Sequence, residues 1–205
     1  MKKVSEVEAF CYSKAMTHNP TPEFLSQNFI IKKASPDDAA GLFDVQRKTW
    51  IATYPNPEIG ITEEDIKIRI EGIDQELVLG KVERWKSTIG DGDRKISVAK
   101  INDKVVGFVA PFYDEASGQH RLGALYVLPE TQGTGVGSAL LRQAFEDIGT
   151  ENDIYLHVVS YNQNAVNFYT KNGFQKTGKD TTGSVSALPS GNHIPEIEML
   201  RLATK

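Results

Sequence analysis

Cysteine is almost absent from this sequence. Cys11 is the only one among 205 residues, so the chain cannot form an internal disulfide bond. Disulfides persist in oxidising compartments and are rare in the cytosol. The scarcity of cysteine therefore favours a protein of a reducing compartment.

Long apolar runs are also missing. No stretch approaches the roughly 18 apolar residues of a membrane-spanning helix, which excludes such a helix. Lys2 and Lys3 are followed by Glu6, Glu8 and Lys14, and not by the apolar core and small-residue cleavage site of a signal peptide. We therefore expect a cytoplasmic protein that has no membrane partner.

The sequence has no excess of positive charge. Lysine and arginine number 23 against 27 aspartate and glutamate residues, which gives a formal net charge of -4. Proteins that grip a nucleic-acid backbone do so with lysine and arginine contacts to phosphate. Nucleic acid is therefore not expected as a partner.

What the sequence does contain is the composition of an ordinary globular domain. Hydrophobic residues make up 40% and charged residues 24% of a chain long enough for one buried core. A capping box at Ser5 and Glu8, followed by Pro20, predicts an N-terminal helical extension over residues 1–27. We expect residues 28–205 to form the main domain.

Apolar periodicity and cap residues predict the elements of that domain. Helices are expected over residues 36–53, from the cap at Thr62 to Ile89 with a bend near Gly80, and over 136–148 and 163–171. Strands are expected over residues 29–31, 96–101, 105–112, 122–127, 154–158, 174–178 and 194–202. This order predicts an α/β (α+β) fold with a mixed sheet and helices packed on its faces.

A glycine-rich turn between a strand and a helix carries the chemistry. Residues 132–138 read Gln-Gly-Thr-Gly-Val-Gly-Ser. The first amides of a helix have no partners within the helix, so they can point at an anion, and the helix dipole adds to the attraction. The turn therefore predicts a cradle for a phosphate or diphosphate group.

Other interpretations of the turn are less well supported or assign it no ligand. A P-loop would need a lysine followed by serine or threonine, and that pair is missing. A Rossmann fingerprint would need a third glycine at the position of Ser138. A tight turn without any ligand is the remaining alternative.

Two ordered motifs resemble those of a known family. Gln132-x-x-Gly135-x-Gly137 resembles the acetyl-CoA-binding signature of the GNAT superfamily of N-acetyltransferases. Residues 162–174, which read Asn-Gln-Asn-Ala-Val-Asn-Phe-Tyr-Thr-Lys-Asn-Gly-Phe, resemble the family's Asn-x-x-Ala-x-x-Phe-Tyr-x-Lys-x-Gly-Phe segment. The resemblance covers about residues 28–202. It implies a mostly antiparallel central sheet, flanked by helices, in which two central strands splay apart.

The resemblance also implies where acetyl-CoA would bind as co-substrate. In that family the diphosphate lies on the glycine-rich loop, the pantetheine arm runs along the preceding strand, and the second motif faces the cofactor from the other side. The implied cofactor-binding residues are Leu125, Tyr126, Val127, Gln132, Gly133, Thr134, Gly135, Val136, Gly137, Ser138 and Asn162.

Catalytic roles follow from the same resemblance. Tyr169 occupies the position whose hydroxyl, in many members, supplies a proton to the sulfur of the departing CoA, although an aromatic residue on a helix can also be core packing. The backbone amide of Val127 would polarise the acetyl carbonyl. The general base stays unassigned, because Glu130 is read as a solvated turn carboxylate and His157 as a structural strand residue.

The acceptor pocket is expected at the first helices. Trp50 and Tyr54 lie four positions apart, so they share a helical face and could wall a pocket for an amine. Core packing is the alternative for Trp50, and Tyr54, beside Pro55, is expected to be exposed.

The expected activity is transfer of an acetyl group from acetyl-CoA to a primary amine of a small molecule or peptide, by direct attack in a ternary complex. The four histidines have no metal-ligand spacing, so no metal is expected. The alternative is a non-catalytic acyl-CoA-binding or regulatory module of the same fold. Dimerisation is frequent in the GNAT superfamily, and a homodimer is therefore one expectation for the assembly.

Overall fold

The computed structural model describes residues 28–72, 75–92, 94–182 and 187–204. The predicted N-terminal extension, residues 1–27, lies outside the described residues. Among the residues described, no helix is both long and apolar enough to cross a membrane.

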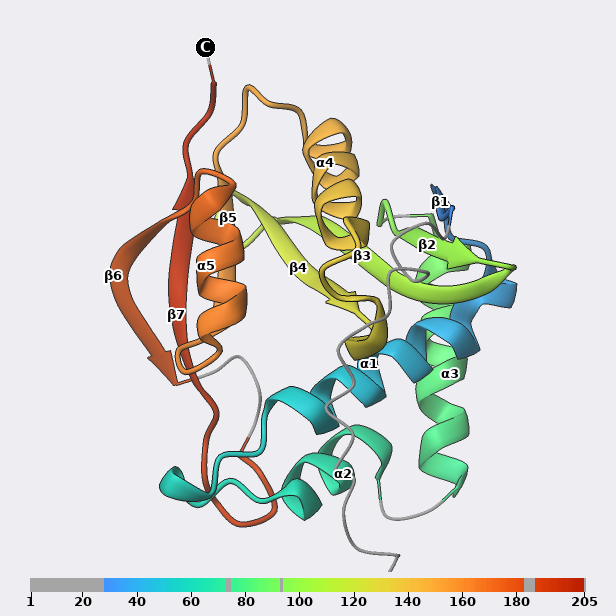
Figure 1. Cartoon of the computed structure of the whole chain (residues 1–205), viewed down its shortest axis with the longest axis vertical. Helices are drawn as coiled ribbons and strands as arrows, with labels where there is room; N and C mark the ends of the chain where they lie inside the picture. The colour runs from blue at the N-terminus through green and yellow to red at the C-terminus, as the bar shows by residue number, and fades with distance from the viewer. Residues whose placement is uncertain (1–27, 73–74, 93, 183–186, 205) are drawn as a thin grey trace, which may run out of the picture.

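The described chain forms one sheet with helices around it (Figure 1). The seven strands lie in the order β1-β2-β3-β4-β5-β7-β6. Their bounds are β1 (Ile30–Lys33), β2 (Ser97–Ile101), β3 (Lys104–Asp114), β4 (Gln119–Val127), β5 (Ile154–Val159), β6 (Gln175–Thr182) and β7 (Pro195–Arg201). The α-helices are α1 (Ala39–Thr53), α2 (Glu63–Glu71), α3 (Gln75–Gly90), α4 (Val136–Ile148) and α5 (Gln163–Lys171).

The sheet is mixed and mostly antiparallel. Only β4 and β5 pair in parallel; the other neighbouring strands described are antiparallel. Asn102 and Asp103, both at positive φ, make the two-residue turn of the β2–β3 hairpin. The predicted fold class is confirmed, including the mixed sheet flanked by helices.

The helix predicted from Thr62 to Ile89 is wrong in one respect. The structure has two helices here, and α2 ends at Gly72, whose φ of 85° is open to glycine and strained for other residues. Gly80, where a bend was expected, lies inside α3. The apolar stripe continues across the break, which is why periodicity alone suggested a single helix.

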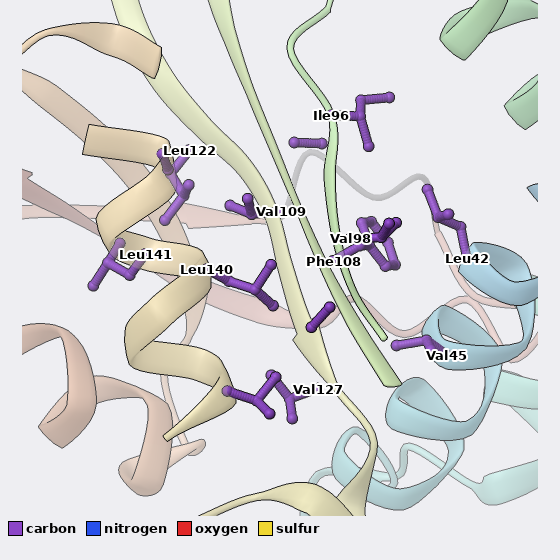
Figure 2. Packing of buried hydrophobic residues seen from close by; sticks show 14 of the residues in the cluster. Leu42, Val45, Ile96, Val98, Phe108, Val109, Leu122, Val127, Leu140 and Leu141 are labelled. Carbon is purple, nitrogen blue, oxygen red and sulfur yellow. The ribbon is translucent and has the colours of Figure 1, made fainter. Parts of the chain in front are cut away.

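The main core lies on both faces of β2, β3 and β4. Figure 2 shows Leu140 and Leu141 of α4 on one side of these strands and Leu42 and Val45 of α1 on the other. Phe108 of β3 is fully buried between the layers. Helices therefore cover both faces of the central strands, and a site can form at the ends of these strands.

A second apolar cluster lies at the C-terminal end of α1. Trp50 packs there with Ile61, Ile66, Leu188 and Ile194, which come from α2 and from the segments before α2 and β7. This cluster fixes residues 188–194, which precede β7, against the first helices.

Polar contacts hold the same junction. Thr62 and Asp65 form a capping box at the start of α2, with the Asp65 amide donating to Thr62 Oγ1 at 3.0 Å. Oδ1 of Asp65 accepts a hydrogen bond from the Ser190 amide at 2.9 Å. Asn192 Nδ2 donates to the Gly60 carbonyl at 2.8 Å.

Candidate active site

The parallel strands β4 and β5 separate soon after they begin. Their pairing is confined to His120 with Ile154 and Arg121 with Tyr155. From there β4 continues to Val127 beside no hydrogen-bonded strand of the described chain on that side, and Figure 1 shows the two ribbons diverging. The structure thus has the splayed central strands that the sequence resemblance implied.

The edge of β4 presents its backbone to this gap. The Leu128 amide donates to the Val106 carbonyl of β3 at 2.9 Å. Hydrogen-bonded and non-hydrogen-bonded pairs alternate along an antiparallel ladder, so the adjacent pair, Gly107 with Val127, is not hydrogen-bonded. The N–H of Val127 therefore points away from β3, toward the gap.

The glycine-rich loop leads directly into the first turn of α4. Gly133 and Gly135 have φ of 80° and 92°, and Gly135 is the N-cap of α4. Within the described part of the chain, the amides of residues 133–138 donate no hydrogen bond. Unpaired amides at a helix N-terminus form an anion site, to which the helix dipole adds positive potential.

Gln132 makes hydrogen bonds within the protein through both its amide and its side chain. Its amide is already engaged with the Pro129 carbonyl at 3.3 Å. Its side-chain Nε2 donates to the Val127 carbonyl, also at 3.3 Å, and Thr49 Oγ1 of α1 reaches the same carbonyl at 3.4 Å. Gln132 therefore ties the loop to the end of β4, and the unpaired amides begin at Gly133.

The second motif lies on α5, on the other side of the gap. Asn162 caps α5 by accepting from the Ala165 amide at 3.1 Å. Tyr169 is buried, packs edge-on against Phe168 and Phe174, and lines the cleft. Burial raises the pKa of the Tyr169 phenol well above its ordinary value, and the nearby Tyr126 of β4 raises it further. Tyr169 is thus a neutral phenol at physiological pH.

Trp50 and Tyr54 form an aromatic wall of the cleft. Trp50 and Tyr54 of α1 pack with ring centroids 4.9 Å apart, and the Tyr54 hydroxyl interacts with that of Tyr126. The indole N–H of Trp50 is buried and has no hydrogen-bond partner among the described residues. The expectation that Tyr54 is exposed is wrong: the residue is partly buried because Trp50 and Tyr126 cover its ring.

The residues that enclose this space form one cleft of about 1260 Å³. It brings together all the predicted site residues except Thr134 and Val136. Thr134 Oγ1 donates back to the Thr131 carbonyl at 2.7 Å, and the side chain of Val136 is fully buried in the core. These two positions can contribute only their amides.

Tyr161 and Glu196 are among the cleft residues that were not predicted from the sequence. Tyr161, directly after β5, donates from its hydroxyl to the Tyr54 carbonyl at 2.6 Å. Glu196 of β7 lines the cleft, and its Oε2 lies 3.9 Å from Nδ1 of His157 on β5. The alternation of charged and apolar residues in the last strand, residues 195–201, is the signal that could have singled out Glu196. Among the described residues no group of three histidine, cysteine or acidic side chains could hold a metal ion.

Comparison with known proteins places this cleft in a family context. Residues 92–176 match the family model described as an acetyltransferase (GNAT) domain. Over 77 residues the chain is 36% identical to the peptidyl-lysine N-acetyltransferase YjaB of Escherichia coli (strain K12), an alignment that covers 38% of this chain and 46% of that protein. Over 83 residues it is 35% identical to N-alpha-acetyltransferase 50 of Danio rerio, covering 38% of this chain and 49% of that protein. The chain thus spans about half the length of these curated relatives.

The similarity of the fold extends further than that of the sequence. The structure superposes on PaiA N-acetyltransferase from Thermoplasma acidophilum, solved in complex with coenzyme A, with a TM-score of 0.63 and 26% identity. That match covers 85% of this chain and 99% of the other. The similarity therefore extends over most of the domain that builds the cleft.

Proposed function

Since residues 92–176 match the family model of a GNAT acetyltransferase domain, we propose that this chain transfers the acetyl group of acetyl-CoA to a primary amine of a small molecule or a peptide. The amine attacks the thioester directly, with both substrates bound. The proposed catalytic domain spans residues 28–205. The unpaired amides of residues 133–138, beside the open edge of β4, carry this assignment.

The loop suits the diphosphate of CoA, and the edge of β4 suits its pantetheine arm. The amides of residues 133–138 would hold the diphosphate, where the dipole of α4 adds about 0.3–1 kcal/mol per negative charge and up to about 2 kcal/mol in a partly buried site. The pantetheine amides would pair with the backbone of Leu125, which faces the gap. The Val127 carbonyl already accepts from Gln132 and Thr49, so its N–H is the group open to the cofactor. The contacts are chiefly main-chain, so they set position without needing a lysine or arginine in the loop.

The reacting groups lie between β4 and α5. The N–H of Val127 would donate to the acetyl oxygen as negative charge develops on it. Tyr169 would protonate the sulfur when the carbon–sulfur bond breaks, and its phenol holds the required proton at neutral pH because burial raises its pKa.

The aromatic wall of the cleft suits an amine acceptor. Trp50 and Tyr54 offer aromatic faces, to which an ammonium group is attracted. The carboxylate of Glu196 lines the same cleft. An acceptor that carries positive charge is therefore favoured over an anionic one.

Calorimetry with CoA and a thiol-release assay test this function. The acceptors are 1,4-diaminobutane, Nα-acetyl-lysine amide and an alanine-initiated tripeptide. CoA binding together with acetyl-CoA-dependent thiol release, and an acetylated amine by mass spectrometry, is expected. Binding of CoA without turnover of any amine favours a non-catalytic acyl-CoA module, and the absence of CoA binding overturns both.

A further inference from the structure

A histidine and two glutamates gather on one face of the sheet where β5 meets β7. In the antiparallel register His157 lies opposite Glu198, and Val159 lies opposite Glu196. Residues opposite each other or two apart share a face, so His157, Glu196 and Glu198 project together. His157 Nδ1 is 3.9 Å from Glu196 Oε2, and His157 Nε2 is 3.7 Å from Glu198 Oε2.

The two glutamates have different surroundings. Glu198 contacts Arg121 at 3.3 Å, Thr177 at 3.0 Å and Lys179 at 3.5 Å. Burial alone would raise the pKa of Glu198, but Thr177 and Lys179 outweigh it and the pKa is lowered. Glu198 is thus held as a structural carboxylate on β7, between β5 and β6.

Glu196 instead faces the acceptor end of the cleft. It lines that cleft together with His157, Tyr54 and Tyr126. Burial raises the pKa of the Tyr54 and Tyr126 phenols, and the negative charge of Glu196 raises both further, which places the carboxylate within electrostatic reach of the aromatic wall. Tyr169, the proposed acid, lines the same cleft from α5.

A primary alkyl ammonium group has a pKa of about 10, so it must lose a proton before it can attack a thioester. We propose that Glu196 binds the ammonium group of the acceptor as an ion pair and accepts that proton. This role rests on the proposed acetyl transfer and adds to it the base that the sequence left unassigned. Glu198, with its own cationic partners, takes no part in the transfer.

The proposed steps balance in protons and electrons over one turnover. One proton moves from the ammonium nitrogen to a Glu196 oxygen, and the freed lone pair forms the carbon–nitrogen bond with the thioester carbon. The carbon–sulfur bond breaks with its electron pair on sulfur, which takes the Tyr169 proton. The second nitrogen proton returns to the tyrosinate through water, and Glu196 releases its proton to solvent. The products are the amide, free CoA and one proton.

Glu196→Gln tests the role because it keeps the size and polarity of the side chain while removing the base. The value of kcat/KM is measured for the parent and the variant from pH 6 to 10, with the acceptor that reacts fastest in the thiol-release screen. The variant is expected to lose about 10²–10³-fold at pH 7. It should regain rate about tenfold per pH unit as solution hydroxide generates the free amine. Its affinity for CoA, measured by calorimetry, should stay within about twofold of the parent, which also shows that it is folded.

Glu198→Gln is the matched control, since it makes the same change two residues along the same strand. It is expected to keep the shape of the parent pH profile. His157→Gln distinguishes His157 from Glu196 as the base. If His157→Gln loses kcat/KM at the low-pH end of the profile and Glu196→Gln does not, the assignment is overturned. So would an unchanged kcat/KM at pH 7 in Glu196→Gln that binds CoA normally. If the parent protein acetylates no amine, the proposed function fails first, which distinguishes the two failures.

Discussion

The hydroxyl of Tyr161 donates a 2.6 Å hydrogen bond to the carbonyl oxygen of Tyr54, 107 residues earlier in the chain. Tyr54 is the C-cap of α1, and Tyr161 follows β5. The bond therefore joins the end of the helix to the end of the strand at the acceptor side of the cleft. It fixes the aromatic wall relative to the sheet that carries Glu196.

Removing this bond is expected to affect the acceptor and not CoA. Tyr161→Phe keeps the ring but leaves the Tyr54 carbonyl without its donor, which should cost about 1 kcal/mol of unfolding free energy. The KM for the amine should rise severalfold, because Trp50 and Tyr54 lose a fixed position. Denaturant unfolding and steady-state kinetics measure the two effects, and calorimetry should give an unchanged Kd for CoA. A weakened Kd for CoA with an unchanged KM would contradict this view of the cleft.

Tyr161 also gives the protein a defined sensitivity to alkali. Burial raises the pKa of Tyr161 from 10.0 to about 12. Because the folded-state pKa is the higher one, the contribution is fully present below about pH 10 and is lost as pH rises toward about 12. Tyr161→Phe should therefore show a shallower fall in unfolding free energy across this range than the parent, measured by urea unfolding at each pH. Equal slopes would show that the hydroxyl does not stay protonated in the folded state.

The acid role of Tyr169 predicts a loss of turnover without a loss of binding. Tyr169→Phe preserves the ring contacts with Phe168 and Phe174 and should lower kcat about 10²-fold or more. The Kd for CoA should stay within a few-fold of the parent. Tyr113→Phe is the control, since Tyr113 is exposed and lies outside the cleft. Normal turnover in Tyr169→Phe would remove the acid assignment and leave the ring as core packing.

The loop predicts a backbone effect on CoA affinity. A Cβ at Gly135 meets no atom within 4 Å, but the φ of 92° is strained for alanine by about 1–2 kcal/mol. Gly135→Ala should relieve that strain by turning the adjacent amides, and so weaken CoA binding about tenfold or more. Calorimetric titration with CoA measures it.

Gly178→Ala separates strain from binding. Gly178 of β6 also has a positive φ, 81°, and open space for a Cβ, but it lies outside the cleft. Both variants should lose similar unfolding free energy, while only Gly135→Ala weakens CoA binding. An equal effect of the two on CoA affinity would mean that general destabilisation, and not the loop geometry, sets the Kd.

Local sequence signals predicted the elements on the glycine-rich-loop side of the cleft. The glycine-rich turn at 133–135 and the apolar face of α4 depend on signals within a few residues, and each is found where it was expected. The acceptor side depends on contacts between distant segments. The ring of Tyr54 is covered by Tyr126 of β4 as well as by Trp50, and no pattern near Pro55 reveals the contact with β4.

The strand register explains the remaining omissions. Glu196 and His157 become neighbours through the pairing of β5 with β7, which are separated by α5 and β6. Pairing of this kind is decided by the whole sheet and is not encoded in either strand. The break at Gly72 could not be predicted for a different reason. The apolar stripe of α2 resumes in α3, so the periodicity of apolar residues does not indicate a turn between them.

The ion pair between Asp38 and Lys100 ties the start of α1 to β2 and predicts acid sensitivity. Asp38 Oδ2 also accepts from the Ser35 amide at 3.0 Å and from its hydroxyl at 3.1 Å, and both ionic side chains are at least nine-tenths buried. Burial acts to raise the pKa of Asp38, but the bonds from Lys100 and Ser35 outweigh it, so the pKa lies below 3.8. The stabilisation is therefore present above about pH 4 and is lost as pH falls through the lowered value.

Asp38→Asn should destabilise the protein at pH 7 by about 1–3 kcal/mol, because the buried Lys100 loses its charged partner. Asp44→Asn is the control, since Asp44 pairs with Arg47 and Lys48 at the partly exposed surface of α1, where each pair is worth about 0–1 kcal/mol. Urea unfolding from about pH 7 down to about pH 2.5 measures both. The gap between the parent and Asp38→Asn should narrow below about pH 4, since the parent's own carboxylate becomes protonated there. A gap that stays constant to the lowest pH would mean that the amide side chain of the variant fails for steric reasons and that the charge of Asp38 contributes nothing.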